Sequence, residues 1–402
     1  MVNVDYLILG AGPAGLTVAN RLLEKGIDSF LVLEKESEAG GLCRSREVDG
    51  SPLDIGGGHI LDVRRPAVTE YLFQFMPREE WNHYMRKSTI QTIGGVEIDY
   101  PYEANIWQFP IKDQVEHLMS IASAGCSVGK EKPEQFDEWI VWKLGEKIAE
   151  DYMFPYNRKI WSIDLKHLGT YWMEKLPDVS LKDTLTSCLA HEPYGALPGH
   201  SQFYYPKKYG FGELWLRMAE RIKDHIHYNE MAKTLDVTRK VINDQYQAKV
   251  IINTVPWTSF EQIQGITPEI DNDIKKLEYS SGVIEYQNEE VSTEAHWTYY
   301  PDESLDYHRI LWRENFCENS KGYWTETNLM RYHQNKDKFS YVNEYAYPLN
   351  TVEKPQAIGR ILGWFKERGI YGLGRWGEWE HLNTDVTVEH ALKFAETITL
   401  NL

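Results

Sequence analysis

The N-terminal stretch VDYLILGAGPAGLTVANRLLEKG constrains the fold more than any other part of the sequence. The apolar run 4–9 predicts a buried parallel strand, and the helical periodicity of 16–25 predicts a helix that ends at Gly26. The turn between them has GxGxxG spacing at Gly10, Gly12 and Gly15. Such glycines allow a tight turn, a close approach of the backbone to a pyrophosphate and close packing of helix on strand. The stretch therefore predicts a unit that holds a dinucleotide at a helix N-terminus.

The next segment extends this unit. A second apolar strand at 29–33 ends at Glu34, where a carboxylate can accept hydrogen bonds from ribose hydroxyls. Pro13 and the continuation EAGGLCRS favour FAD over NAD, and the pattern resembles the two-dinucleotide-binding flavoproteins of the amine oxidase and UDP-galactopyranose mutase kind. The residues of this region assigned to the cofactor are Gly10, Gly12, Pro13, Ala14, Gly15, Glu34, Lys35, Gly41, Leu42 and Arg44.

Two distant segments look like the rest of this domain. TLDVTRKVINDQYQAKVIINTVP predicts two strands around a polar turn and an apolar strand at 249–254, stopped by Pro256. GLGRWGEWEHLNTDVTVEHALKFAETI predicts a glycine-rich turn and a helix capped near 383–385, whose N-terminus would point at the flavin pyrimidine or the pyrophosphate. Gly374, Arg375 and Asp385 are assigned to the cofactor on this basis.

The stretch SPLDIGGGHIL places three consecutive glycines before His59. Such a run suits neither strand nor helix and is tolerated where backbone lies flat against a partner. In the flavoprotein superfamily this segment passes the flavin ring, which would bring Gly57, Gly58 and His59 to the isoalloxazine. A plain loop with a surface histidine is the alternative.

Composition excludes several classes of partner. With 43 basic and 60 acidic side chains the net charge is −17, which disfavours nucleic acid and anionic lipid. There is no apolar run long enough for a membrane span, and the N-terminus leads directly into a strand without a signal peptide, so we expect a cytoplasmic protein. The four cysteines are far apart, which predicts reduced thiols, and no metal site is assigned.

DIGGGHILDVRRP resembles the GGH segment of UDP-galactopyranose mutases. Four further stretches resemble that family in the same order: IDYPYEANIWQFP, FPYNRKIWSIDLKHLGTYWMEKLP, FYYPKKYGFGELWLRMAERI and HWTYYPDESLDYHRILW. The resemblance implies a redox-neutral reaction, in which N5 of a reduced flavin attacks the anomeric carbon of a UDP-sugar. The sugar ring then opens and recloses with another ring size.

The same resemblance implies roles for individual residues. His59, Arg309 and Arg375 would be the catalytic residues, although the flavin performs most of the chemistry. Arg309 and Tyr347 would bind the diphosphate, while Asn157 and Trp161 would line the nucleotide side. The complete set assigned to the substrate is Tyr102, Glu103, Asn157, Trp161, Lys175, Arg309, Tyr347 and His381.

Three of these positions depart from the family. Lys175 replaces an arginine of the diphosphate clamp and lacks its bidentate fork. His381 replaces a tyrosine, and Glu103 replaces a glutamine beside the uracil, although a carboxylate only accepts hydrogen bonds. Because all three departures fall on the substrate side, the sequence specifies the cofactor more firmly than the substrate.

The expected fold is α/β, with three units. An FAD-binding Rossmann-like (two-dinucleotide-binding) domain would comprise 1–85, 200–255 and 355–402. A helical insertion would span 104–195, and an antiparallel sheet substrate domain would use 86–103 and 256–350.

The function expected first is an FAD-dependent mutase that interconverts ring forms of a nucleotide-activated sugar, with a UDP-sugar as substrate, in surface-glycan (polysaccharide) biosynthesis. The alternative is an FAD-dependent oxidoreductase of the amine oxidase or protoporphyrinogen oxidase type. A third hypothesis is a flavin-bound scaffold without activity. A homodimer is among the assemblies that the sequence allows.

Overall fold

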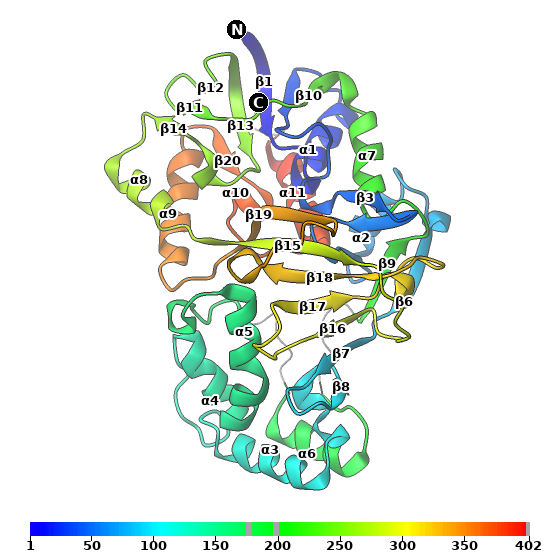
Figure 1. The fold of residues 1–402 in the computed structure, drawn as a ribbon. Helices are drawn as coiled ribbons and strands as arrows, with labels where there is room; N and C mark the ends of the chain where they lie inside the picture. Colours follow the sequence, from blue (N-terminus) through cyan, green and yellow to red (C-terminus); the bar gives the residue numbers. More distant parts are fainter. Residues whose placement is uncertain (174–178, 196–200, 399–402) are drawn as a thin grey trace.

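The computed structural model describes residues 1–173, 179–195 and 201–398. Its largest sheet lies at the end of the molecule that carries the N-terminus, at the top of Figure 1. Strand β1 (Val2–Leu9) runs parallel to both of its neighbours, β2 (Phe30–Leu33) and β13 (Tyr246–Asn253). The other strands of this sheet are β10 (Ile226–His227), β11 (Thr234–Asp236), β12 (Val241–Ile242), β14 (Gln262–Gln264) and β20 (Ile370–Gly372).

Helices cover both faces of this sheet because the side chains of β1 alternate between two apolar cores. Tyr6 and Ile8 belong to the core on one face and Leu7 and Leu9 to the core on the other. On the first face α1 (Pro13–Glu24) packs against α7 (Gly212–Glu220) and α11 (Thr384–Ile398). On the second face α8 (Pro268–Lys275) packs against α9 (Lys354–Lys366).

A second sheet crosses the middle of the molecule (Figure 1). Its strand order is β19 (Ser340–Pro348), β15 (Tyr279–Gln287), β18 (Tyr323–Asn328), β17 (Tyr307–Leu311), β16 (Trp297–Tyr299), β7 (Ser88–Gln91) and β8 (Glu97–Asp99). The pairs are antiparallel except β16 with β7, which is parallel. Two small sheets join the units: β3 (Ser45–Val48) with β4 (Ser51–Asp54), and β5 (Leu61–Asp62) with β9 (Gln202–Pro206) and β6 (Trp81–Met85).

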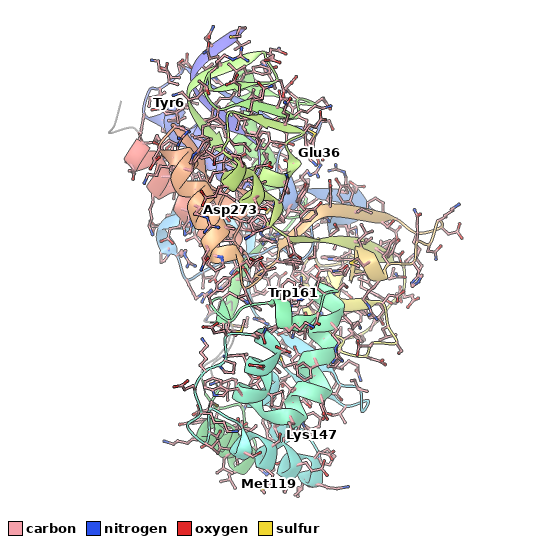
Figure 2. All side chains as sticks on the ribbon, turned by 90° about the vertical axis from the view of Figure 1, so that its left-hand side faces the viewer. Tyr6, Glu36, Met119, Lys147, Trp161 and Asp273 are labelled. Atoms are coloured by element: carbon pink, nitrogen blue, oxygen red, sulfur yellow. The ribbon has the colours of Figure 1, made fainter. Side chains whose placement is uncertain are left out.

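A helical unit lies on the side of the second sheet away from the first sheet (Figure 1). It contains α3 (Ile111–Ser123), α4 (Phe136–Ile148), α5 (Phe154–Trp161) and α6 (Leu181–Ala190), with a π-helical turn at Ala149–Met153 between α4 and α5. Helix α5 contacts β17 and β18. Figure 2 shows Trp161, at its C-terminal end, where the helical unit meets the sheet, whereas Met119 lies at the far tip. The described residues also contain two short α-helices, α2 (Pro66–Leu72) and α10 (Gly374–Gly377).

The expected fold class is confirmed: a Rossmann-like α/β sheet, a group of helices and a largely antiparallel sheet. One segment differs from the expectation that 256–350 forms the second sheet. Strand β14 pairs with β11 in the first sheet, and Ile270 and Ile274 of α8 enter its core. A three-residue strand carries too little pattern to indicate which sheet it joins. None of the helices in the described ranges is long and apolar enough to cross a membrane.

Candidate active site

The glycine-rich turn after β1 opens onto a cavity of about 540 Å³. Gly10 has a φ of +97°, and a Cβ there would lie 2.7 Å from Thr254 Oγ1. A Cβ on Gly15 would lie 2.0 Å from the carbonyl oxygen of Gly10, so α1 packs directly on the turn. The N-terminus of α1, at Gly12 and Pro13, lines the cavity and carries no side-chain cap. Its N–H groups are therefore available to an anion.

Glu34 is fixed at the wall of this cavity by backbone donors. Its Oε2 accepts from the N–H of Ala11 at 2.7 Å, and its Oε1 accepts from the N–H of Glu36 at 2.9 Å. Burial raises the pKa of the Glu34 carboxyl, while these hydrogen bonds and the charge of Arg44 oppose the rise. The predicted cofactor residues that line the cavity are Gly10, Gly12, Pro13, Ala14, Glu34, Lys35, Gly41, Leu42, Arg44, His59, Gly374 and Arg375.

Arg44 also lines this cavity. Its Nε donates to the carbonyl of Gly41 at 2.9 Å and its Nη2 donates to Tyr341 Oη at 2.8 Å. Its Nη1 lies 3.3 Å from the carboxylate of Glu36. The guanidinium is therefore held by three neighbours before any ligand arrives.

A second cavity, of about 340 Å³, shares His59, Arg375 and Thr384 with the first. The Nδ1 atom of His59 lies 3.1 Å from the carbonyl oxygen of Gly57, so the neutral tautomer that donates from Nδ1 leaves Nε2 as an acceptor. Burial and then the charge of Arg375 lower the pKa of His59 to about 3. The imidazole is therefore neutral at physiological pH, and it stands at the junction of the two cavities.

Arg375 is tied to the backbone around the same junction. Its Nε and Nη2 donate to the carbonyl of Leu382 at 3.2 and 2.9 Å, and its Nη1 donates to the carbonyl of Ala346 at 3.0 Å. Burial lowers the pKa of its guanidinium, and its carbon lies 5.8 Å from the ring centroid of Tyr347. Arg375 thus lines both cavities, and its hydrogen bonds fix the backbone at Leu382 and Ala346.

Arg309 faces the second cavity and forms an ion pair with Glu326. The two residues are directly opposite each other on β17 and β18, and Arg309 Nε donates to Glu326 Oε2 at 2.6 Å. Burial alone would lower the pKa of Arg309, but the charge of Glu326 raises it above its usual value. The other oxygen of Glu326 accepts from the N–H of Gly58 at 3.0 Å. A single buried carboxylate thus connects the arginine to the glycine run.

Glu103 is buried in the wall of the second cavity. Burial raises the pKa of its carboxyl to about 7, against the opposing charge of Lys143. At neutral pH the group is therefore close to half protonated, and a protonated carboxyl both donates and accepts. A protonated Glu103 can therefore make the same kinds of hydrogen bond as the glutamine expected at this position, which a charged carboxylate could not do.

Aromatic rings surround the same region. Trp161 Nε1 donates to Asn157 Oδ1 at 2.9 Å, and Asn157 Nδ2 donates to the carbonyl of Met153 at 2.7 Å. Asn157 therefore orients the indole, whose ring meets Tyr347 edge-on at 5.9 Å between centroids. His381 meets Tyr347 at 5.0 Å. The predicted residues that line this cavity are Gly57, Gly58, His59, Glu103, Asn157, Trp161, Arg309, Tyr347, Arg375 and His381.

Three predicted residues of the described ranges do not line these cavities. Tyr102 points away from the cavity, and its hydroxyl contacts His117 Nε2 at 3.0 Å. Asp385 is ion-paired to Arg65 instead of facing the cofactor cavity. Gly15 lies beneath the turn, where it allows packing and does not line the cavity. Lys175 is outside the described residues.

Several lining residues were missed from the sequence. Tyr156 and Tyr299 meet edge-on at 5.5 Å, and Arg86 and Asn383 also line the second cavity. Glu326 was missed too. An acidic residue in the middle of a strand such as WTETN, among residues that are buried, indicates that a basic partner is buried beside it. Within the described ranges no group of three His, Cys, Asp or Glu side chains could hold a metal ion, and the four cysteines are free thiols.

Comparison with known protein families identifies the fold of the N-terminal region. Residues 8–75 match the family model of the NAD(P)-binding Rossmann-like domain, which covers the turn, α1, β2 and the glycine run. Together with the Rossmann-like sheet and the cavity at its glycine turn, this match gives the N-terminal part of the chain the fold of a dinucleotide-binding domain.

Two similarities extend over nearly the whole chain, and a third covers part of it. A probable UDP-galactopyranose mutase of Klebsiella pneumoniae is 21% identical over 98% of this chain and 95% of its own length. The crystal structure of a reduced UDP-galactopyranose mutase superposes with a TM-score of 0.89 and 22% identity, covering 100% of this chain and 95% of that one. A dTDP-fucopyranose mutase of Escherichia coli is 21% identical over 42% of this chain and 45% of its own length. The chain is UDP-galactopyranose mutase-like in sequence and in fold, as the resemblance implied.

Proposed function

We propose that the chain is an FAD-dependent mutase that changes the ring form of a nucleotide-activated sugar, with a UDP-sugar as the first substrate to test. The observation that carries this proposal is the junction at His59 and Arg375, where the dinucleotide cavity meets a second cavity lined by aromatic rings and arginines. We expect the product to serve surface-glycan synthesis.

The residues of the first cavity suit FAD. The bare N-terminus of α1 suits a pyrophosphate, and Glu34 presents carboxylate oxygens suited to ribose hydroxyls. Glu34, Arg44 and His59 all line this cavity, which gives room for an isoalloxazine near His59, whereas Gly57 and Gly58, also assigned to the cofactor, line the second cavity. Bound in its reduced form, FAD would supply the nucleophile that an otherwise redox-neutral ring interconversion needs.

The chain's own residues would bind and orient the sugar nucleotide. Trp161, held by Asn157, offers a flat face for the nucleotide side. Arg309 and Tyr347 offer a guanidinium and a hydroxyl to the diphosphate, with Glu326 fixing the direction of the guanidinium. The neutral His59 can accept a proton or hydrogen bond at Nε2 without adding a positive charge beside Arg375.

The oxidoreductase alternative predicts a different second cavity. An amine, porphyrinogen or isoprenoid substrate favours a lipophilic tunnel, whereas this cavity has Arg86, Arg309 and Arg375 in its wall. Three guanidiniums suit an anionic substrate. The mutase proposal therefore stands first.

The test is an anaerobic assay of the purified protein with UDP-galactose, in which the ring form of the product is separated chromatographically. We expect interconversion of pyranose and furanose after reduction with dithionite and none with the oxidised protein, which is the matched control. Formation of hydrogen peroxide from an amine or porphyrinogen, with no interconversion in the reduced state, would overturn the proposal.

A further inference from the structure

Glu103 is the one carboxylate among the described residues that line the second cavity, whose wall also carries three arginines. The residue is 8% exposed, and its carboxyl accepts from its own backbone N–H. Lys143 is the cation whose charge opposes the effect of burial on its pKa. Because the two oxygens of a carboxylate offer about four acceptor positions, the carboxyl can accept further hydrogen bonds from a ligand.

The turn that carries Glu103 is fixed on both sides. The hydroxyl of Tyr102, which precedes it, lies 3.0 Å from Nε2 of His117 on α3. The carbonyl of Ala104, which follows it, accepts from Oγ of Ser187 on α6 at 2.6 Å. The backbone of Glu103 is therefore held in place before a ligand arrives, so little conformational entropy is lost when the carboxyl binds one.

Aromatic side chains of the helical unit lie beside this carboxyl. The ring of Tyr152 stacks on Tyr102 with 5.2 Å between centroids. Burial first, and then neighbouring charges that include Glu103, raise the pKa of the Tyr152 hydroxyl. Every nucleobase has a π-face that stacks on such rings, so the rings supply affinity without selecting the base. The aromatic residues of the helical unit that line the cavity are Phe136, Trp139, Tyr152, Tyr156, Trp161 and Trp172.

Charge limits which part of a nucleotide-activated sugar can meet Glu103. A carboxylate repels an anionic group and accepts from N–H and O–H groups. The reacting sugar belongs at the junction with the dinucleotide cavity, at His59 and Arg375, whereas Glu103 lies on a turn held by α3 and α6 of the helical unit. Under the proposed function, the part that meets Glu103 is therefore the base, which is flat and carries N–H donors.

The bases differ in the edge that they offer to a carboxylate. Guanine presents two adjacent donors, N1–H and the 2-amino group, which the two oxygens of a carboxylate accept as a parallel pair. Uracil presents one N–H between two carbonyl oxygens, and cytosine presents one amino group beside an acceptor nitrogen. An ionised carboxylate therefore matches guanine and repels the oxygens of uracil, whereas a protonated carboxyl, which donates and accepts, matches uracil.

We propose that Glu103 selects the nucleobase and that its ionised form binds the paired N–H donors of guanine, so that the chain prefers a GDP-sugar to a UDP-sugar above neutral pH. This inference rests on the proposed function and deepens it, because it keeps the nucleotide-activated sugar and specifies its base.

Proton linkage follows from the proposal. Burial raises the pKa of the free Glu103 carboxyl to about 7, so at pH 7 guanine binding releases about half a proton and uracil binding takes up about half. The neighbouring Tyr100 and Tyr152 stay neutral, because burial raises the pKa of both hydroxyls. Binding of GDP should therefore strengthen from pH 6 to pH 8, while binding of UDP weakens.

The test is calorimetric titration of the oxidised, FAD-loaded protein with GDP, UDP and CDP at pH 6 and pH 8. All three probes carry the same ribose and diphosphate, so a difference among them reports the base alone. We expect the wild type to bind GDP about 10- to 100-fold more tightly than UDP at pH 8. Glu103→Gln should reverse this preference, because an amide both donates and accepts. Glu97→Gln, at an exposed position on β8, is the control and should bind as the wild type does.

The outcomes separate this inference from the proposed function. Binding of UDP or CDP at least as tight as that of GDP at pH 8, or a preference for GDP that Glu103→Gln retains, overturns the inference and leaves the mutase proposal standing. Binding of GDP that depends on Glu103, without ring interconversion of any sugar nucleotide in the reduced state, supports the inference and contradicts the proposed function. If the folded, FAD-loaded wild type binds none of the three nucleotides, both are wrong.

Discussion

Arg309 and Glu326 face each other across β17 and β18, and the Nε–Oε2 distance of 2.6 Å makes them a direct ion pair. Glu326 also accepts from the N–H of Gly58, so one carboxylate holds both Arg309 and the glycine run. The Glu326 side chain is 5% exposed and the Arg309 side chain 18%. Removing the acid would leave a largely desolvated guanidinium without its partner.

Glu326→Gln is therefore expected to lower the free energy of unfolding by about 3 kcal/mol, because breaking a buried pair from one side leaves an uncompensated charge. Urea denaturation followed by tryptophan fluorescence measures this. Glu314→Gln, at an exposed position beyond β17, is the control and should change stability by less than about 0.5 kcal/mol. Equal midpoints for the two variants would show that the pair contributes nothing to the fold.

Glu103 should make ligand binding depend on pH. Burial raises the pKa of its carboxyl to about 7, so the neutral form grows from about 10% at pH 8 to about 90% at pH 6. Since only the neutral form can donate to a base carbonyl, UDP-galactose should bind more tightly as the pH falls across this range. Calorimetry between pH 6 and 8 measures the effect. Glu103→Gln should bind with a flat profile; a flat profile in the wild type as well would contradict the role.

Gly10→Ala should abolish cofactor loading. The alanine would have to adopt a φ of +97° and would place its Cβ 2.7 Å from Thr254 Oγ1, at a cost of about 2 kcal/mol or more. The measurement is the ratio of flavin to protein absorbance after purification. Gly359→Ala is the matched control: this exposed position within α9 has nothing within 4 Å, so the change should leave flavin content unaltered and stabilise the helix by about 0.5–1 kcal/mol. Normal flavin content in Gly10→Ala would refute the geometry of the turn.

Asn157→Ala should act on substrate binding through Trp161. The change leaves the indole N–H and the carbonyl of Met153 without their described partner, which costs about 1–3 kcal/mol of stability. Because the indole then loses its fixed orientation, KM for UDP-galactose should rise severalfold while kcat changes little. Steady-state kinetics separate the two. A fall in kcat with an unchanged KM would instead assign Asn157 to the chemical step.

Most residues that the sequence assigned to the dinucleotide gather around one cavity because the signals that single them out are local. Glu34 follows the glycines at a spacing that the strand–helix–strand unit imposes, and it lines the cavity as expected. Glu326 escaped prediction because its partners, Arg309 and Gly58, lie 17 and 268 positions away. Such a pair depends on strand register, which a single sequence does not specify.

Two further differences have the same kind of cause. Tyr102 and Glu103 are neighbours on one 3₁₀ turn, and a one-residue change rotates a side chain from the cavity to the core. Asp385 lies in the first turn of α11, where a carboxylate commonly interacts with the helix N-terminus. Its side chain instead pairs with Arg65, which lies 320 positions away in the sequence. A sequence motif predicts that such residues lie near the site, but it does not predict the direction in which their side chains point.

His59 and Arg375 are among the residues that line both cavities, and this has a thermodynamic consequence. A ligand that fixes the position of either side chain changes the free energy with which the other cavity is filled. By linkage this coupling is reciprocal: a ligand of the second cavity would strengthen binding of the dinucleotide by the same factor by which the dinucleotide strengthens binding of that ligand. Under the proposed function, the oxidation state of a bound flavin would then affect the affinity for the substrate through side chains that line both cavities.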